Sequence, residues 1–254
     1  MASYEVEDGL AAEAAAARVV RRTPEIEGLV ALATQGRLIR HCARGVQFFA
    51  DPMNEVIKGV GAHLWFAARA LIDFIAPGGQ GAILPGSRVC ELGAGLGAVG
   101  LVLHALSDCK VTLTDLPHVL PLLDFNAAHV ACVCPVREPA RVAALRWGSS
   151  QDLAGLAHEH FDVLLGADIA YEDEQHLPLL MTLEALADGP RTRVLLALAD
   201  RDDGTLRSFL LLAASRGWRI EPIVLAHRGD EGETIVANPV VVLEGRAPAL
   251  AISA

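Results

Sequence analysis

The 254-residue sequence predicts an α/β fold, a doubly wound and mostly parallel sheet with helices on both faces. Three observations support this class. From residue 88 to residue 216, apolar segments of strand length alternate with segments of helical periodicity. Most of the strand segments are continuous apolar runs, as expected for strands that are covered on both faces. A glycine-rich loop, 93–97, follows the first of these strands and opens a helix.

The first 57 residues precede this alternation, and we expect them to form an N-terminal extension (1–57). Residues 10–22 have strong helix propensity, and Pro24 is expected to end that helix after Thr23. Residues 38–50 divide at Arg44-Gly45 into two short β-prone segments, which predicts a hairpin.

The main domain is expected over 58–245 and begins with a helix over 58–75, where apolar residues recur at helical spacing. The strand and helix segments that follow alternate regularly. Parallel strands are expected at 88–92, 110–114, 142–147, 161–167 and 193–199, with helices at 96–106, 117–130, 173–187 and 205–216.

Two further β-prone segments, 218–226 and 234–243, complete a predicted sheet of seven strands. The turn residues 228–232 join them without room for a crossover helix, so an antiparallel hairpin is expected. The tail, 246–254, is expected to be loose.

Composition narrows the function classes. A net charge of −10 and a pI of about 5.3 argue against general binding to nucleic-acid backbones. No apolar run reaches the length of a membrane span, and the acidic N-terminus does not resemble a secretory signal. The five scattered cysteines indicate reduced thiols, and Cys132 and Cys134 are not expected to hold a metal. We expect a monomer in the cytoplasm, with the nucleus left open.

The glycine loop fits two nucleotide cofactors. Glycines let a ligand approach the backbone closely, and the helix that follows presents free N–H groups. The pattern Glu91-x-Gly93-x-Gly95-x-Gly97 is typical of loops that bind S-adenosylmethionine (SAM), whereas Gly95-x-Gly97-x-x-Gly100 fits a nicotinamide dinucleotide fingerprint. The loop by itself leaves a SAM enzyme and an oxidoreductase both open.

Acidic and aromatic residues follow the ends of the later strands. In doubly wound sheets, ligands bind at these carboxyl ends. Asp115 lies 22 residues after Gly93, where a carboxylate can accept both ribose hydroxyls; a helix N-cap is the alternative. Asp168 could likewise cap a helix, and Trp147 and Tyr171 could be core residues. Their shared position at strand ends favours a binding site.

Four motifs carry a resemblance to a known family: ELGAGLG at 91–97, TDL at 114–116, LRWG at 145–148 and DIAY at 168–171. Together they resemble the seven-β-strand methyltransferases of family 16, a group with many protein-lysine methyltransferases. The resemblance covers residues 58–225 and includes the segment GAHLWFAA before the glycine loop. The glycine loop is common to SAM enzymes, whereas the later motifs are more specific.

This resemblance implies a Rossmann-like methyltransferase fold, SAM as the methyl donor and S-adenosylhomocysteine as the product. It implies an enzyme that methylates a lysine side chain of a protein substrate. A small-molecule amine or another protein side chain is the alternative acceptor. A nicotinamide-dependent oxidoreductase and a SAM-binding module without catalysis are alternatives from other classes.

The resemblance also implies residue roles. Asp168 and Tyr171 are the catalytic candidates and would face the acceptor amine. Asp115 would hold the ribose, while Leu116 and Trp147 would contact the adenine. The full set of expected cofactor-binding residues is Trp65, Glu91, Gly93, Gly95, Gly97, Asp115, Leu116, Trp147 and Ala167.

Overall fold

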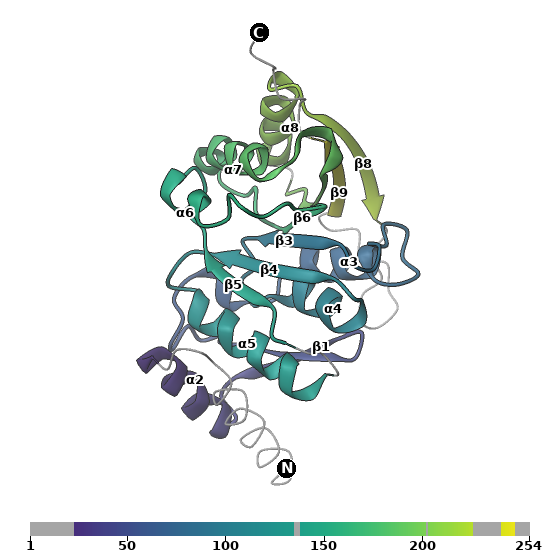
Figure 1. Cartoon of the computed structure of the whole chain (residues 1–254). Helices are drawn as coiled ribbons and strands as arrows, with labels where there is room; N and C mark the ends of the chain where they lie inside the picture. Colours follow the sequence, from purple (N-terminus) through teal and green to yellow (C-terminus); the bar gives the residue numbers. More distant parts are fainter. Residues whose placement is uncertain (1–22, 135–137, 202, 226–239, 247–254) are drawn as a thin grey trace.

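The computed structural model describes residues 23–134, 138–201, 203–225 and 240–246. In these residues, seven strands form one sheet in the order β5-β4-β3-β6-β7-β9-β8 (Figure 1). β3 to β7 are parallel, whereas β9 is antiparallel to both β7 and β8. The predicted fold class and its C-terminal hairpin are therefore confirmed. The strands are β3 (Arg88–Leu92), β4 (Lys110–Asp115), β5 (Arg141–Ala144), β6 (Val163–Ala167), β7 (Arg193–Ala199), β8 (Arg219–Leu225) and β9 (Val240–Arg246).

Helices cover both faces of this sheet (Figure 1). Successive strand residues point to opposite faces, so Val89 of β3 packs in one apolar core while Cys90 and Leu92 pack in the other. Each strand is therefore covered on both faces, which explains why most strand segments of the sequence are apolar. The helices are α3 (Phe66–Ile75), α4 (Ala98–Leu106) and α5 (Leu120–Val133) on one face, and α6 (Ser150–Ala154), α7 (Asp173–Leu186) and α8 (Thr205–Ser215) on the other.

The predicted N-terminal hairpin is present as β1 (Ile39–Ala43) and β2 (Val46–Ala50). Arg44 and Gly45 have φ angles of 52° and 85° and form its two-residue turn. Positive φ at both central positions is typical of the hairpin turn whose twist matches the strands.

The helix α2 (Pro24–Thr34) was not predicted from the sequence. Pro24 is its first residue, and the Thr23 side chain accepts a hydrogen bond from the Ile26 N–H at 3.4 Å. A threonine followed by a proline can begin a helix as well as end one. The N–H groups of the first helical turn have no partner within the helix, so proline, which has no N–H, is well suited to that position. The predicted helix 10–22 lies outside the described residues.

A buried asparagine fixes the N-terminal hairpin to the domain. The Asn126 side chain on α5 accepts from the Phe49 N–H at 2.8 Å and donates to the Phe49 carbonyl at 2.9 Å. It also donates to the Leu96 carbonyl in the glycine loop at 3.0 Å. β2, α5 and the cofactor loop are thereby joined at one point.

Several expected boundaries were wrong. The helix expected over 58–75 begins only at Phe66, after a short 3₁₀ turn η1 (Val60–Ala62). The strand expected over 142–147 ends at Ala144, so Trp147 lies in a loop. The residues after that loop form α6, which was not predicted; Ser149 caps it by accepting from the Asp152 N–H.

The C-terminal hairpin also differs in its bounds. β9 (Val240–Arg246) ends three residues beyond the expected end at 243, and the expected start at 234–239 lies outside the described residues. The expected turn 228–232 and the tail 247–254 lie outside the described residues.

Candidate active site

A cavity of about 620 Å³ opens at the carboxyl ends of β3, β4 and β6. The chain runs outward from β3 through β4 to β5 and then returns to β6 on the other side of β3. Ligands bind at such a reversal of strand order because the connecting loops diverge there. The predicted site residues that line the cavity are Trp65, Glu91, Gly93, Gly95, Asp115, Leu116, Trp147, Ala167, Asp168 and Tyr171.

Two glycines of the loop are required by close contacts. Gly93 and Gly95 have φ angles of 58° and 54°, a conformation that side chains disfavour. A Cβ at position 93 would lie 3.2 Å from the Trp147 ring, and one at position 95 would lie 2.9 Å from the Gly61 carbonyl oxygen. The loop therefore presents bare backbone to the cavity.

Gly97 is the one predicted site residue that does not line the cavity. It precedes α4, and a Cβ there would lie 2.7 Å from Leu123, beneath the loop. A Cβ at Gly100 would lie 2.4 Å from Leu113. Both glycines thus let α4 pack closely against its neighbours. This packing also explains why Gly97 and Gly100 match the spacing of the dinucleotide fingerprint.

Asp115 organises the glycine loop. Its Oδ2 accepts from the Gly95 N–H at 2.7 Å and its Oδ1 from the Leu116 N–H at 2.6 Å. α5 begins only at Leu120, which rules out the helix-cap alternative. Burial raises the pKa of Asp115, with the two backbone N–H groups acting against that shift. Each carboxylate oxygen keeps a second lone pair for a ligand hydroxyl.

Glu91 lies deeper in the same cavity and is only 2% exposed. Its Oε2 accepts from the Gly100 N–H at 2.8 Å. Burial raises the pKa of Glu91 to about 8, and the nearby charge of Asp115 adds to the shift. The glycine loop thus holds a carboxyl group that is protonated at neutral pH.

This carboxyl group makes stability depend on pH. Because the folded pKa lies above the unfolded value, the contribution of Glu91 is complete below about pH 4.5 and declines until about pH 8. The slope is at most about 1.4 kcal/mol per pH unit. We expect the free energy of unfolding, measured with urea, to fall less in Glu91→Gln than in wild type as the pH is raised from 5 to 8. Parallel profiles for the two proteins would contradict this assignment, and exposed Glu174→Gln is the control.

Asp168 follows β6 in an unusual backbone conformation, with φ of 57°. Its N–H donates to the Ala197 carbonyl at 2.8 Å, which pins the residue to β7. Its Oδ2 accepts from the Arg201 guanidinium at 2.6 Å. α7 begins at Asp173, so Asp168 does not cap it. Sequence reasoning missed Arg201, although it lies just beyond the end of a predicted strand at Ala199.

Large apolar side chains surround the mouth of the cavity. Trp65, Leu116 and Tyr171 are 42%, 43% and 41% exposed, so these three are not core residues. The Trp65 indole N–H donates to the Val60 carbonyl at 3.1 Å, which fixes the ring. Burial, followed by the charge of Glu172, raises the pKa of Tyr171, so its hydroxyl stays protonated at neutral pH.

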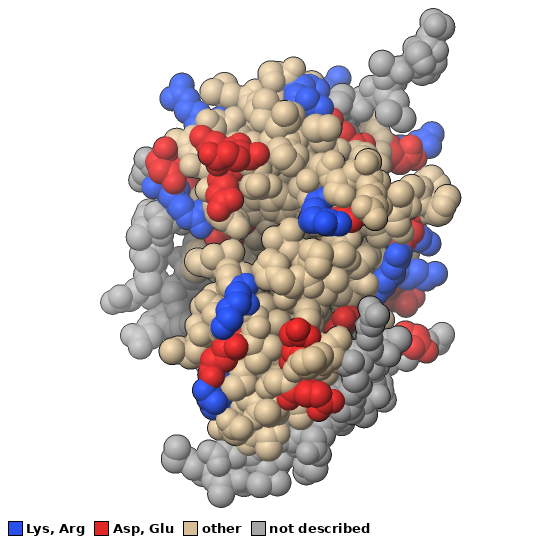
Figure 2. Space-filling model, turned by 90° about the vertical axis from the view of Figure 1, so that its left-hand side faces the viewer, with Lys and Arg blue, Asp and Glu red and all other residues tan. Residues whose placement is uncertain are grey.

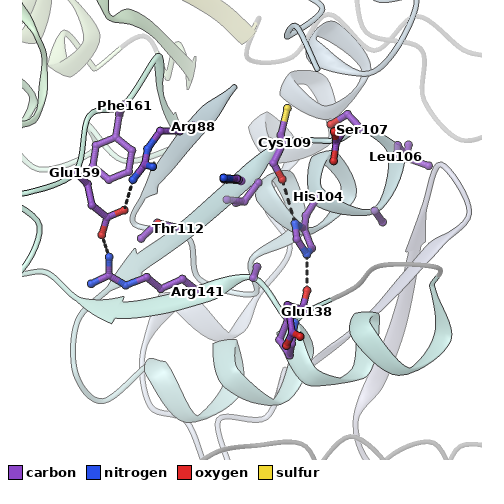
Figure 3. Close-up of a pocket in the computed structure, with 16 residues that line it drawn as sticks. Arg88, His104, Leu106, Ser107, Cys109, Thr112, Glu138, Arg141, Glu159 and Phe161 are labelled. Atoms are coloured by element: carbon purple, nitrogen blue, oxygen red, sulfur yellow. Dashed lines mark hydrogen bonds and ion pairs between the residues drawn. The ribbon is translucent and has the colours of Figure 1, made fainter. Parts of the chain in front are cut away.

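A second cavity, of about 780 Å³, lies at the opposite edge of the sheet, where β3 and β4 begin (Figure 3). Three of its charged side chains form ion pairs, and its histidine is bonded to backbone carbonyls. Glu159 contacts both Arg88 and Arg141, and His104 is bonded to the carbonyls of Cys109 and Glu138 at 3.4 and 2.9 Å. None of the predicted site residues lines it. The candidate active site is therefore the cavity at the carboxyl edge.

Comparison with solved structures supports the fold. The structure resembles P. horikoshii TYW2 in complex with MeSAdo, with a TM-score of 0.52, 14% identity, and coverage of 89% of this chain and 86% of that chain. At this identity the likeness shows the fold alone. The fold is that of the methyltransferases, with the cavity at the reversal of strand order.

Sequence comparison is more specific. Residues 51–214 match the model of a family described as "Lysine methyltransferase". Mouse "EEF1A lysine methyltransferase 3" is 36% identical over 173 residues, which are 68% of this chain and 69% of the relative. Zebrafish "Protein N-lysine methyltransferase METTL21A" is 42% identical over 133 residues, 52% of this chain and 57% of the relative.

The chain belongs to the lysine methyltransferase family. The family predicted from the sequence is confirmed, and with it the enzyme class and SAM as the methyl donor. The nicotinamide-dependent oxidoreductase is thereby excluded. The chain spans little more than half the length of the zebrafish relative, so the acceptor and the partners are matters for proposal.

Proposed function

We propose that the protein transfers methyl groups from SAM to the side-chain amine of a lysine in a protein substrate. One observation carries this proposal: a single cavity is lined by the glycine loop with Asp115 and also by Asp168 with Tyr171. The first group suits a nucleoside cofactor, and the second suits an amine.

The residues present fit SAM. The cavity volume of about 620 Å³ is within the range of small-molecule sites. Asp115 has lone pairs for both ribose hydroxyls, and Leu116 and Trp147 offer apolar surface to an adenine ring. The bare backbone at Gly93 and Gly95 receives the methionine part, beside Glu91, Trp65 and Ala167. When bound, SAM supplies an electrophilic methyl group on a positively charged sulfonium.

The acceptor amine is bound and oriented by Asp168 and Tyr171. A lysine has an unperturbed pKa of about 10.4 and reacts only after losing its proton. Asp168 and the protonated hydroxyl of Tyr171 orient the neutral amine toward the methyl group. Most of the rate increase comes from this alignment, because no covalent intermediate on the protein is needed.

A protein acceptor is supported by the exposed apolar residues around the mouth and by the names of the relatives. On the face shown in Figure 2, basic side chains occur in small groups beside acidic ones, which favours a protein partner over a nucleic acid. Among the described residues, no helix is long and apolar enough to cross a bilayer. We further propose a monomer that works in the cytoplasm or the nucleus.

The division of the chain into an N-terminal extension, a main domain and a C-terminal tail is also a proposal. We propose that the extension 1–57 supports the domain 58–245 by packing against it. The domain ends at Arg246, the last residue of β9, one residue later than expected. Packing of Ile26 and Phe48 in the same core as α5 supports this role for the extension.

The proposed function is tested with tritiated SAM, using purified EEF1A and a cell extract as acceptors. We expect label in a protein band and, after hydrolysis, in Nε-methylated lysine. The enzyme itself contains just two lysines, Lys58 and Lys110, so self-labelling is recognised by mapping two positions. Label confined to small molecules, or to another amino acid, would refute the proposal. Heat-inactivated enzyme is the control.

A further inference from the structure

Asp168, the residue expected to face the acceptor amine, is already paired with a cation. The Arg201 guanidinium donates to its Oδ2 at 2.6 Å. The Asp168 side chain is 7% exposed, whereas that of Arg201 is 36% exposed and reaches the solvent. The pair joins the loops after β6 and β7, and only Asp168 lines the cavity. Arg201 therefore contacts the carboxylate from outside the cavity lining.

Apart from Arg201, the charged groups near Asp168 do not balance the negative charge of its carboxylate. Arg146 lies in the cavity wall, but its guanidinium binds Asp152 through two hydrogen bonds of 2.7 Å. Without Arg201, the mouth would thus carry an excess of acidic groups. The titratable or charged side chains that line the cavity together with Asp168 are His63, Glu91, Asp115, His118, Arg146, Tyr171 and Glu172.

This pairing matters for the reaction, because only the neutral amine is a nucleophile. An uncompensated carboxylate within a few ångströms of an amine stabilises the ammonium form and raises the pKa of the amine. A carboxylate that already shares its charge with a guanidinium stabilises the ammonium much less. It can still accept a hydrogen bond from the neutral amine through its free lone pairs.

We propose that Arg201 is a positioning residue that neutralises Asp168, so that the acceptor lysine enters the cavity as a free amine. The inference rests on the proposed function. The proton that the ammonium loses passes to water at the mouth. The N–C bond then forms as the S–C bond breaks, and a second proton leaves the methylated nitrogen for water.

The test is the pH dependence of methyl transfer in Arg201→Met, which removes the charge but keeps a long side chain. Rates are measured from pH 6.5 to pH 10 at saturating tritiated SAM. The acceptor is EEF1A, or the extract protein that the wild-type enzyme labels most strongly. We expect the acidic limb of kcat, measured at saturating acceptor, to move upward by about one to three pH units, because kcat reports the amine bound in the cavity. Near pH 10 the variant should approach the wild-type rate.

Two further variants separate charge from structure. Arg201→Lys keeps the positive charge, and its acidic limb should stay within about 0.3 pH units of wild type. Arg216→Met removes a guanidinium of similar exposure, 33%, that binds Glu184 outside the cavity. This matched control should leave the profile in place. The other cavity groups are present in every variant, so their titration is common to all the profiles.

The outcomes are distinguishable. If wild type labels no lysine in any protein, the proposed function fails. If wild type is active and Arg201→Met loses rate equally at every pH, Arg201 is purely structural and the inference is wrong. If Arg201→Met does not fold, Arg201→Gln takes its place. An acidic limb that shifts as far in Arg201→Lys as in the neutral variant would also overturn the inference.

Discussion

Replacing Asp168 with asparagine is expected to lower methyl transfer by about 100-fold or more while SAM binding stays within about threefold of wild type. Asparagine has nearly the same shape and tolerates the positive φ of 57° at this position, so the backbone is not strained. What changes is the hydrogen bonding at the amine site, because one acceptor oxygen becomes an NH2 donor and the Arg201 guanidinium loses its counter-charge. Asp168 follows β6, whereas the glycine loop that would hold the cofactor follows β3.

Initial rates with the labelled acceptor measure the first effect, and calorimetry with SAM measures the second. Asp173→Asn, at an acidic residue that is 64% exposed, is the control and should be fully active. Full turnover by Asp168→Asn would show that Asp168 of the DIAY motif is not needed for methyl transfer. A loss of SAM affinity as large as the loss of rate would instead place Asp168 in the cofactor site.

Replacing Asp115 with alanine is expected to raise the dissociation constant for SAM by about 100-fold, a loss of about 2.7 kcal/mol. Two effects combine. The ribose hydroxyls lose their acceptor, and the N–H groups of Gly95 and Leu116 lose the carboxylate that holds the loop in shape. Asp115→Asn keeps one side-chain oxygen, so we expect an intermediate affinity.

Calorimetry with SAM and S-adenosylhomocysteine checks this result, and urea unfolding of the free protein checks that the fold is retained. The exposed Asp73→Ala is the control. Unchanged affinity in Asp115→Ala would rule out the ribose role. Saturating SAM should restore much of the rate in this variant, in contrast to Asp168→Asn, because the acceptor side is intact.

Most of the fold could be predicted because its strands are buried on both faces. β3 and β7 begin and end where the apolar runs do, at Arg88–Leu92 and Arg193–Ala199. Errors occurred where a local signal has two meanings. Thr23-Pro24 begins α2 instead of only ending a helix, and the polar residues after Trp147 form α6 because Ser149 caps it.

The site was predictable to the extent that it is built at strand ends. Asp115, Trp147 and Asp168 line one cavity because parallel strands deliver their carboxyl ends to the same edge of the sheet. Gly97 could not be distinguished from Gly93 and Gly95 by spacing alone. Its packing against Leu123 depends on how α5 crosses beneath the loop.

The sequence by itself determined the order of strands and helices, the glycine loop and the family, because apolar period and short motifs are local properties of the chain. Only the tertiary structure decided how charges are shared. Arg201 lies 33 residues from Asp168, and the guanidinium reaches the carboxylate because β6 and β7 are neighbours in the sheet. Burial of Glu91 under α4 likewise raises the pKa of its carboxyl, an effect of packing that no local motif records.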